Sequence, residues 1–266
     1  MEPVATDPSS AYQGVADAWA RGPAALYDRL ASLCIADVAD QLRGKLVLDV
    51  GAGTGSLCRA LQTAGAAAVA LDTSRDMLRL IGDTAALSLA GDMCALPFAG
   101  GRFEAAVSGF AISHIDAPEN ALREMRRVVR TRGWVIAAVF GEAAASASKD
   151  AVDDVARDFG YQPPGWYVQL KTRTEPRSNT PTRLARCAEM AGLDDIEIRD
   201  VVVDPGIDTP EAIAAYRAGL AHMAPFVASL SDSTRAEFVE HAVAAVRKRG
   251  QAVRPRVLVL SSRVPA

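Results

Sequence analysis

The chain has 266 residues, half of them hydrophobic, and a net charge of −3 at pH 7. This length and apolar content suffice for one large α/β core with embellishments, and the slightly acidic balance provides no general attraction for nucleic acid. No apolar run approaches the ~20 residues of a membrane span, and no basic-then-apolar leader opens the sequence, so we expect a cytoplasmic protein without a membrane partner.

The first predicted elements are helices. Residues 11–42 show apolar positions at helical spacing, with a break at Gly22-Pro23. The side chains expected to face inward are Leu26, Leu30, Leu33 and Val38. Tyr27 in the same stretch either covers a bound ligand or belongs to the core, and the pattern leaves both open.

A glycine loop follows the first predicted strand. Leu46–Val50 reads as a buried parallel strand, and residues 56–64 read as the next helix, so the chain must turn sharply between them. The turn holds Gly51, Gly53 and Gly55, and glycine lets the backbone pass close to a ligand. Because ligands of doubly wound α/β sheets lie beyond the carboxyl ends of the strands, this corner predicts a nucleotide site.

Two details argue against a dinucleotide. Ser56 stands where the G-x-G-x-x-G fingerprint of NAD enzymes has its third glycine. Asp49, just before the loop, would repel a pyrophosphate but suits a cation. An NAD(P) oxidoreductase is therefore disfavoured.

The later strand tips also carry polar residues. Residues 66–71 form a second apolar run that ends at Asp72, where a carboxylate is placed to accept hydrogen bonds from ribose hydroxyls. Alternatively, Asp72 only opens a turn before a helix capped by Ser74. A third run, 85–90, leads to Asp92.

These motifs together resemble the class I S-adenosylmethionine (SAM) methyltransferases. The loop from Asp49 to Gly55 is similar to their (D/E)-x-G-x-G-x-G motif, and Gly91–Phe98 is similar to their G-D-x-x-x-L-P-F stretch. Phe103–His114 resembles their fourth strand, with Glu104 where Asp is usual. The resemblance covers roughly residues 45–140, in the style of the ubiquinone and menaquinone methyltransferase branch.

The resemblance implies a set of cofactor contacts. Asp92 would accept from the adenine amino group, and Met93 would pack on the ring with its polarisable side chain. The full set of cofactor-binding residues that we expect is Asp49, Gly51, Gly53, Gly55, Asp72, Thr73, Met77, Asp92, Met93, Ser108 and Tyr27.

It also implies the fold, a doubly wound Rossmann-like sheet of seven strands in the order 3-2-1-4-5-7-6, with the last strand antiparallel. The expected later elements are a helix over 118–130, a strand over 134–140, a helix over 181–191 capped by Thr180, and strands over 196–203 and 256–262. We expect one domain, in which a helical cap (1–43) precedes a cofactor-binding core (44–141). Residues 142–180 and 205–252 would form an acceptor-site lid and a helical insertion, unless these helices merely cover the sheet edge.

His114, just past the fourth strand, is the candidate general base, with an ionisation near that of an ordinary histidine. It is as consistent with a packing or loop-bonding histidine. His222 is a weaker alternative base, and His241 is expected to face solvent. We expect no metal, because no acidic cluster is apparent and the four cysteines are scattered.

The sequence thus predicts a SAM-dependent methyltransferase that acts on a small, fairly apolar acceptor, with S-adenosylhomocysteine (SAH) as product. The acceptor is expected to be a bacterial secondary metabolite methylated on O or N rather than C, and the protein to be a monomer or homodimer. The alternative is a SAM-binding protein of the same fold without methyl transfer, either a cyclase or a structural partner.

Overall fold

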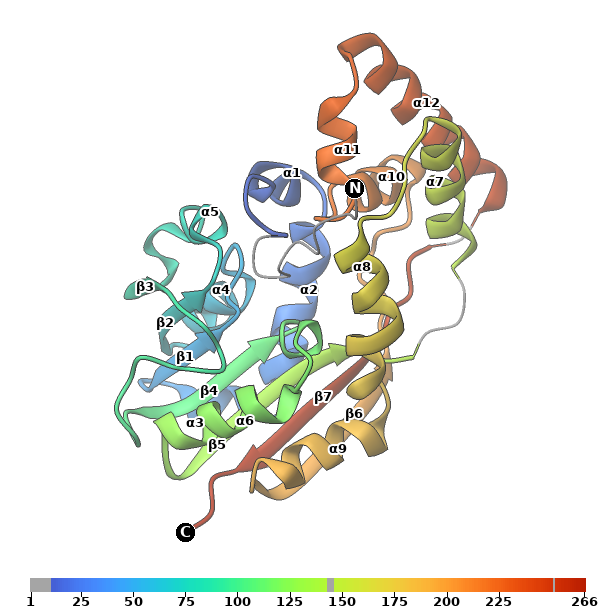
Figure 1. Ribbon diagram of the computed structural model, residues 1–266. Coiled ribbons are helices and arrows are strands. Elements are labelled where there is room, and N and C mark those ends of the chain that lie inside the picture. Colours follow the sequence, from blue (N-terminus) through green and yellow to red (C-terminus); the bar gives the residue numbers. More distant parts are fainter. Residues whose placement is uncertain (1–10, 143–145, 251) are drawn as a thin grey trace.

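The computed structural model describes residues 11–142, 146–250 and 252–266, which fold around one seven-stranded sheet (Figure 1). The strand order is β3-β2-β1-β4-β5-β7-β6, and β7 runs antiparallel to both of its neighbours, as predicted. The strands are β1 (Leu46–Val50), β2 (Ala67–Asp72), β3 (Leu87–Ala90), β4 (Phe103–Gly109), β5 (Val129–Phe140), β6 (Asp194–Val202) and β7 (Arg256–Arg263).

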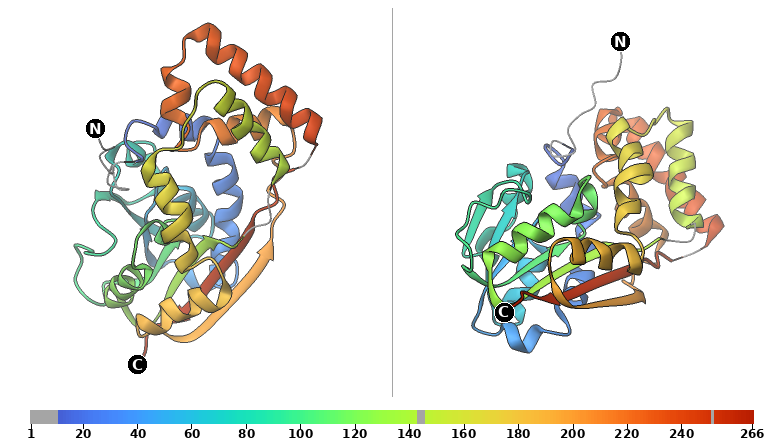
Figure 2. Two further views of the ribbon diagram at one scale, coloured as in Figure 1. Left: turned by 45° about the vertical axis from the view of Figure 1, so that its right-hand side comes forward. Right: turned by 60° about the horizontal axis from the view of Figure 1, so that its bottom comes forward.

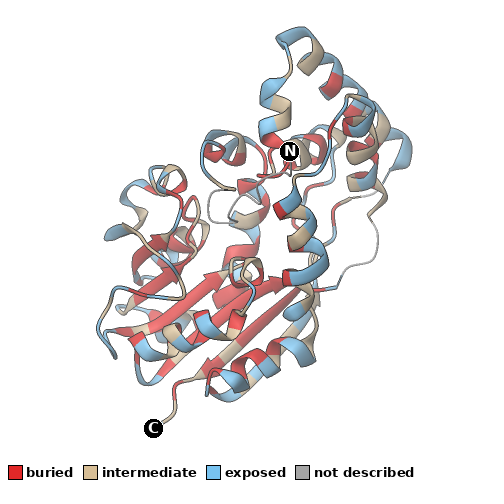
Figure 3. Cartoon of the chain, viewed as in Figure 1, coloured by how far each residue is buried: buried red, intermediate tan, exposed pale blue. Residues whose placement is uncertain are grey.

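Helices cover both faces of the sheet, which explains why its central strands are continuously apolar. On β1, Val47 packs in one core cluster and Leu48 in the other, because successive side chains point to opposite faces. The Val47 face is covered by α2 (Ala24–Ile35), α3 (Ala39–Leu42) and α4 (Ser56–Thr63), and the Leu48 face by α6 (Pro118–Val128) and α9 (Pro181–Met190). Figure 3 shows the buried residues concentrated in the central strands.

A helical cap stands beyond the carboxyl ends of the parallel strands (Figures 1 and 2). Its members are α1 (Ala16–Arg21), α7 (Ala147–Asp158), α8 (Gly165–Gln169), α10 (Pro210–Ala218), α11 (Ala224–Ser229) and α12 (Asp232–Arg249). A small apolar cluster containing Trp19, Met77 and Trp166 joins the N-terminal helices to the inserted ones. The predicted N-terminal helices and the predicted helical insertion before the last strand are both present.

Helix starts follow the predicted caps. The side chains of Ser74, Thr180 and Thr209 each accept a hydrogen bond from the backbone N–H three residues on, and they open α5 (Arg75–Leu78), α9 and α10. No helix among the described residues combines the length and apolar character that a membrane crossing needs.

One local prediction was wrong. Strand β5 begins at Val129 rather than at residue 134, because the chain leaves α6 directly into the sheet and turns at Arg132, whose φ is +62°. Leu33 is only half-buried, but it packs against the core as its expected inward side requires.

Candidate active site

The loop between β1 and α4 is held by main-chain bonds that leave its inner side open. The N–H groups of Gly51 and Ala52 donate to the carbonyl of Leu71, which ties the loop to the tip of β2. Gly53 has φ +53°, and a side chain there would meet no atom of the described residues within 4 Å. At Gly51, by contrast, a side chain would run into Ala111. The open space at Gly53 belongs to a cavity.

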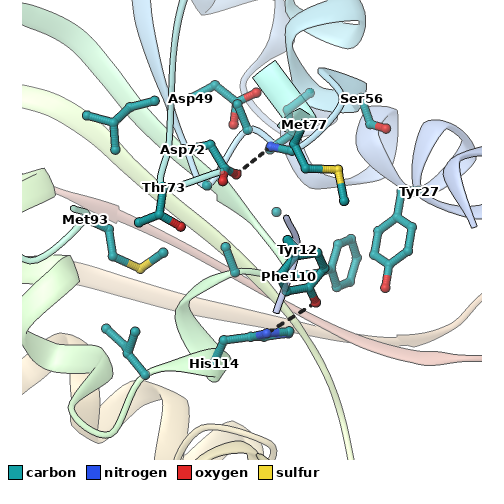
Figure 4. A pocket seen from close by; sticks show the side chains of 18 of the residues that line it. Tyr12, Tyr27, Asp49, Ser56, Asp72, Thr73, Met77, Met93, Phe110 and His114 are labelled. Carbon is teal, nitrogen blue, oxygen red and sulfur yellow. Dashed lines mark hydrogen bonds between the residues drawn. The ribbon is translucent and has the colours of Figure 1, made fainter. Parts of the chain in front are cut away.

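This cavity, which we call the loop cavity, has a volume of about 550 Å³ and lies at the carboxyl ends of β1, β2 and β4 (Figure 4). Most predicted cofactor residues line it, together with His114. They are Asp49, Gly51, Gly53, Asp72, Thr73, Met77, Asp92, Met93 and Tyr27.

Two predicted residues do not line the loop cavity. Gly55 precedes α4, where its φ of +86° turns the chain into the helix. Ser108 is buried within β4, and its hydroxyl has no hydrogen-bond partner among the described residues. For Gly55 the motif therefore reflects the turn rather than a wall of the cavity.

Some wall residues were not predicted. Phe110 and Ala111 directly follow β4, so the strand-tip argument that found His114 would have found them too. Gln169 and Thr174 come from the end of α8 and from the π-helical turn Leu170–Thr174, and no spacing in the sequence connects them to the glycine loop.

The Asp72 carboxylate holds the glycine loop by hydrogen bonds and also faces the loop cavity. One carboxylate oxygen accepts from the Gly53 N–H at 2.8 Å, and the other accepts from the Ser74 N–H at 2.8 Å. Burial raises the pKa of this carboxyl, while these backbone donors oppose the rise. Each oxygen keeps a further lone pair for a ligand hydroxyl.

Asp49 is fully buried below the loop. The Cys58 thiol donates to its Oδ2 at 3.2 Å, whereas Oδ1 has no partner among the described residues. Burial raises the pKa of Asp49 to about 7. A buried carboxyl with one unpaired oxygen at a cavity wall is suited to a cationic ligand.

His114 lies in the short 3₁₀ helix Ile112–His114 after β4. Its Nδ1 is 3.4 Å from the Tyr12 hydroxyl, and the two rings are 5.7 Å apart (Figure 4). Burial, and to a lesser extent the charge of Lys171, lowers the pKa of His114 to about 4. The imidazole is therefore neutral at physiological pH, which corrects the expectation of an ordinary histidine ionisation.

A second cavity of about 1020 Å³, the cap cavity, adjoins the first under the helical cap. Both cavities share Tyr12, Trp19, Tyr27 and His114 as wall residues. Trp166 and Tyr167 of helix α8 add aromatic surface to the cap cavity.

The other two histidines differ sharply. His222 is 5% exposed and lines the cap cavity, where its Nδ1 is 2.7 Å from the Tyr161 hydroxyl and its ring stacks on Tyr167 at 3.8 Å. Burial and the nearby charges of Arg217 and Lys171 hold its pKa well below the usual range. His241 is exposed, as expected.

Among the described residues, no cluster of His, Cys, Asp and Glu has the arrangement to hold a metal.

Residues 48–137 match the family model described as methyltransferase domain. Over 109 residues the chain is 38% identical to demethylmenaquinone methyltransferase of Renibacterium salmoninarum, covering 40% of this chain and 46% of that protein. Malonyl-[acyl-carrier protein] O-methyltransferase of Pseudescherichia vulneris is 39% identical over 114 residues, covering 42% of this chain and 45% of that protein. The chain thus spans about half the length of these relatives.

Among solved structures, a protein assigned as a methyltransferase of an antibiotic biosynthesis pathway in Anabaena variabilis has the same fold. Its TM-score is 0.58 at 18% identity, with 85% of this chain and 95% of that chain covered. The matched residues include the glycine loop, the tips of β2 and β4 and most of the loop cavity. The match over residues 48–137 and the two relatives therefore support a methyltransferase domain of the class I, S-adenosylmethionine-dependent type, similar to the quinone methyltransferase-like branch.

Proposed function

We propose that this protein transfers the methyl group of SAM to a small, fairly apolar acceptor, which is bound in the cap cavity. The observation that carries the proposal is the junction of two cavities at Tyr12, Tyr27 and His114. Most residues of the loop cavity belong to the matched domain, whereas most residues of the cap cavity lie outside the match. A methyl group presented at that junction would face the acceptor.

The cofactor roles follow from position and charge. Asp72 would accept from the ribose hydroxyls, and Asp92 from the adenine amino group, with Met93 against the ring. Gly53 would lie against the methionine part, where the wall is open. The unpaired oxygen of Asp49 would face the ammonium group, so cofactor binding would supply the positive charge that this buried carboxyl lacks.

His114 is the proposed base for an acceptor whose nucleophile carries a proton. Methyl transfer needs the nucleophile in line with the carbon–sulfur bond, and an O–H or N–H⁺ group must lose its proton as the new bond forms. Because the imidazole of His114 is neutral at physiological pH, it can take that proton. We therefore propose methylation on O or N, because methylation on carbon depends less on a base such as His114.

The acceptor must be determined by the cap. The two relatives carry names with different acceptors, a quinone and a malonyl carrier protein, at nearly equal identity over the cofactor half. The cap residues 146–177 and 209–250 lie outside the matched domain. This supports an enzyme whose specificity is set by these inserted helices, and we propose that it is a cytoplasmic enzyme of secondary metabolism.

Two measurements test the proposal. SAM or SAH, but not NADH, should raise the melting temperature of the protein. Release of SAH in the presence of an acceptor from a panel of phenols and amines would then show transfer. Binding of SAM with no SAH release across the panel, together with conversion of an acceptor in which the methyl group stays on SAM, would favour the cyclase alternative instead.

A further inference from the structure

Five cationic side chains line the cap cavity: Arg254 and Arg256, which form salt bridges with Asp204 and Asp200, and three that come from different cap elements. Lys149 comes from α7, Lys171 from the π-helical turn after α8, and Arg217 from α10. Helices α7 and α10 pack against each other in the cap (Figures 1 and 2). This wall is therefore more basic than the chain as a whole, whose net charge is −3.

Two of the three charges from the cap elements are neutralised within the protein. Arg217 forms two hydrogen bonds of 2.6 Å with Asp153, and the Lys171 ammonium lies 2.7 Å from Glu175. Lys149 has no carboxylate oxygen within 4 Å among the described residues. The half-buried Lys149 ammonium thus remains as an unpaired positive charge.

Such a charge is costly unless an anion accompanies it. Burial and the neighbouring charges of Arg217 and Lys171 lower the pKa of Lys149, while the more weakly acting charges of Asp150 and Asp153 oppose that shift. An anionic ligand beside Lys149 would reverse that shift.

A second, independent feature lies on the same cavity wall. His222 is buried, and its Nε2 has no hydrogen-bond partner among the described residues, although Nδ1 is satisfied by Tyr161. Buried polar atoms without partners are rare in folded proteins and often mark places where a ligand or water completes the bonding. The wall therefore offers a charge and a polar atom that the protein leaves unmatched.

The junction end of the cap cavity is apolar instead. Trp19 stacks on Tyr27 with ring centres 4.9 Å apart, and Tyr27 meets Phe140 edge-on at 6.0 Å. All three line the cavity. A ligand that contacts both these rings and Lys149 would need an apolar or aromatic body and a polar group.

We propose that the acceptor carries one anionic group, a carboxylate or a phosphate, which binds Lys149 while its apolar body lies against Trp19 and Tyr27. This inference rests on the proposed function, which identifies the ligand of the cap cavity as the methyl acceptor. The charge preference of the cavity can be measured without any methyl transfer.

The test uses three probes with one aromatic body: naphthoate, naphthyl phosphate and naphthamide. Each is titrated by calorimetry into the full-length protein saturated with SAH. Because a charge-assisted bond is markedly stronger than a neutral one, at least one acid should bind about tenfold or more tightly than the amide. Tighter binding of naphthoate would indicate carboxylate recognition, and tighter binding of naphthyl phosphate would indicate phosphate recognition.

Lys149→Gln should abolish this preference and leave SAH affinity unchanged, because Lys149 does not line the loop cavity. The matched control is Lys248→Gln, which removes the same charge from an exposed position on α12 and should keep the preference. Equal binding of acid and amide, no binding of either acid at millimolar concentration, or a preference that survives Lys149→Gln would overturn the proposal. Failure of SAH itself to bind would instead count against the proposed function, and the acid preference is then measured without it.

Discussion

The two cavities are built in opposite ways. The loop cavity is bounded by short turns at neighbouring strand tips, and main-chain groups such as the Gly53 N–H fix its shape. The cap cavity is bounded by side chains from helices that are distant in the sequence, among them Lys149, Trp166 and Arg217. The difference teaches that one fold can keep a common cofactor site while it varies the acceptor site. Changes in the loop cavity should therefore act on SAM, and changes in the cap cavity on the acceptor.

The largest expected effect breaks the loop cavity alone. Gly53→Val should abolish SAM binding, because its side chain would project into space that the protein leaves open. Part of the damage would be backbone strain at φ +53°, so the control is Gly82→Val, at φ +57° with equally open surroundings outside both cavities. Calorimetry should show native SAM affinity for the control only. A Gly53→Val variant with native affinity would refute the cofactor assignment.

The next effect concerns the junction of the two cavities. His114→Ala should lower kcat about a hundredfold or more, with SAM affinity nearly unchanged. Since the pKa of His114 is lowered to about 4, the native rate should rise as pH increases through that region and stay level between pH 6 and 8. That low-pH step should be missing in the variant.

The control for that experiment is His241→Ala, which removes an exposed histidine far from this chemistry and should leave both the rate and its pH profile intact. Turnover that survives His114→Ala would move the base to His222 or to a tyrosine of the cap. A step near the ordinary histidine range would show that the cavity is wetter than its walls indicate.

A smaller effect separates two roles of Asp72. Asp72→Ala should weaken SAM by about 1.5–3 kcal/mol, the range for a hydrogen bond to a charged group. Because Asp72 also holds the Gly53 and Ser74 N–H groups, loop damage must be distinguished from a lost ribose contact. Calorimetry with SAH and with an analogue lacking the ribose 2′-hydroxyl completes a double-mutant cycle. Strictly additive losses would mean that Asp72 only shapes the turn.

The smallest expected effect is the pH dependence of cofactor binding. With a pKa of about 7, Asp49 is mostly protonated at pH 6, and only its ionised form attracts the ammonium group of SAM. SAM should therefore bind severalfold more weakly at pH 6 than at pH 7.5, in proportion to the ionised fraction. Asp49→Asn should flatten this dependence, and a native pH profile in that variant would remove Asp49 from the site.

The same shift has a consequence for stability. Because folding raises the pKa of Asp49 above its ordinary value, this group favours the folded state most at low pH, and that contribution is lost as pH rises toward about 7. Asp49→Asn should accordingly raise the melting temperature of the cofactor-free protein by a few degrees at pH 8. A lower melting temperature there would show that the carboxylate is stabilised by contacts other than the ligand.

The sequence predicted the site well where the fold determines the position of a residue from the strand that it follows. Asp72 and His114 follow strands β2 and β4, and parallel strands end at one edge, so their convergence on the loop cavity could be predicted. The start of β5 was missed because tertiary packing, rather than local pattern, decides it.

The cap cavity could not be predicted in this way. Gln169 reaches the loop cavity, and Lys149 and Arg217 reach the cap cavity, only because α7, α8 and α10 pack together over the sheet. No periodicity in the sequence relates positions so far apart. The predicted lid over residues 142–180 indicated an acceptor region, but not which side chains would form its wall.

The most direct test of the account is a crystal structure of the protein with SAH. We predict the ribose hydroxyls at Asp72, the adenine at Asp92 and Met93, and the sulfur at the junction, directed toward the cap cavity between Tyr12 and His114. A sulfur atom facing away from the cap cavity, or SAH bound outside the loop cavity, would contradict the central claim that the two cavities meet where the methyl group is transferred.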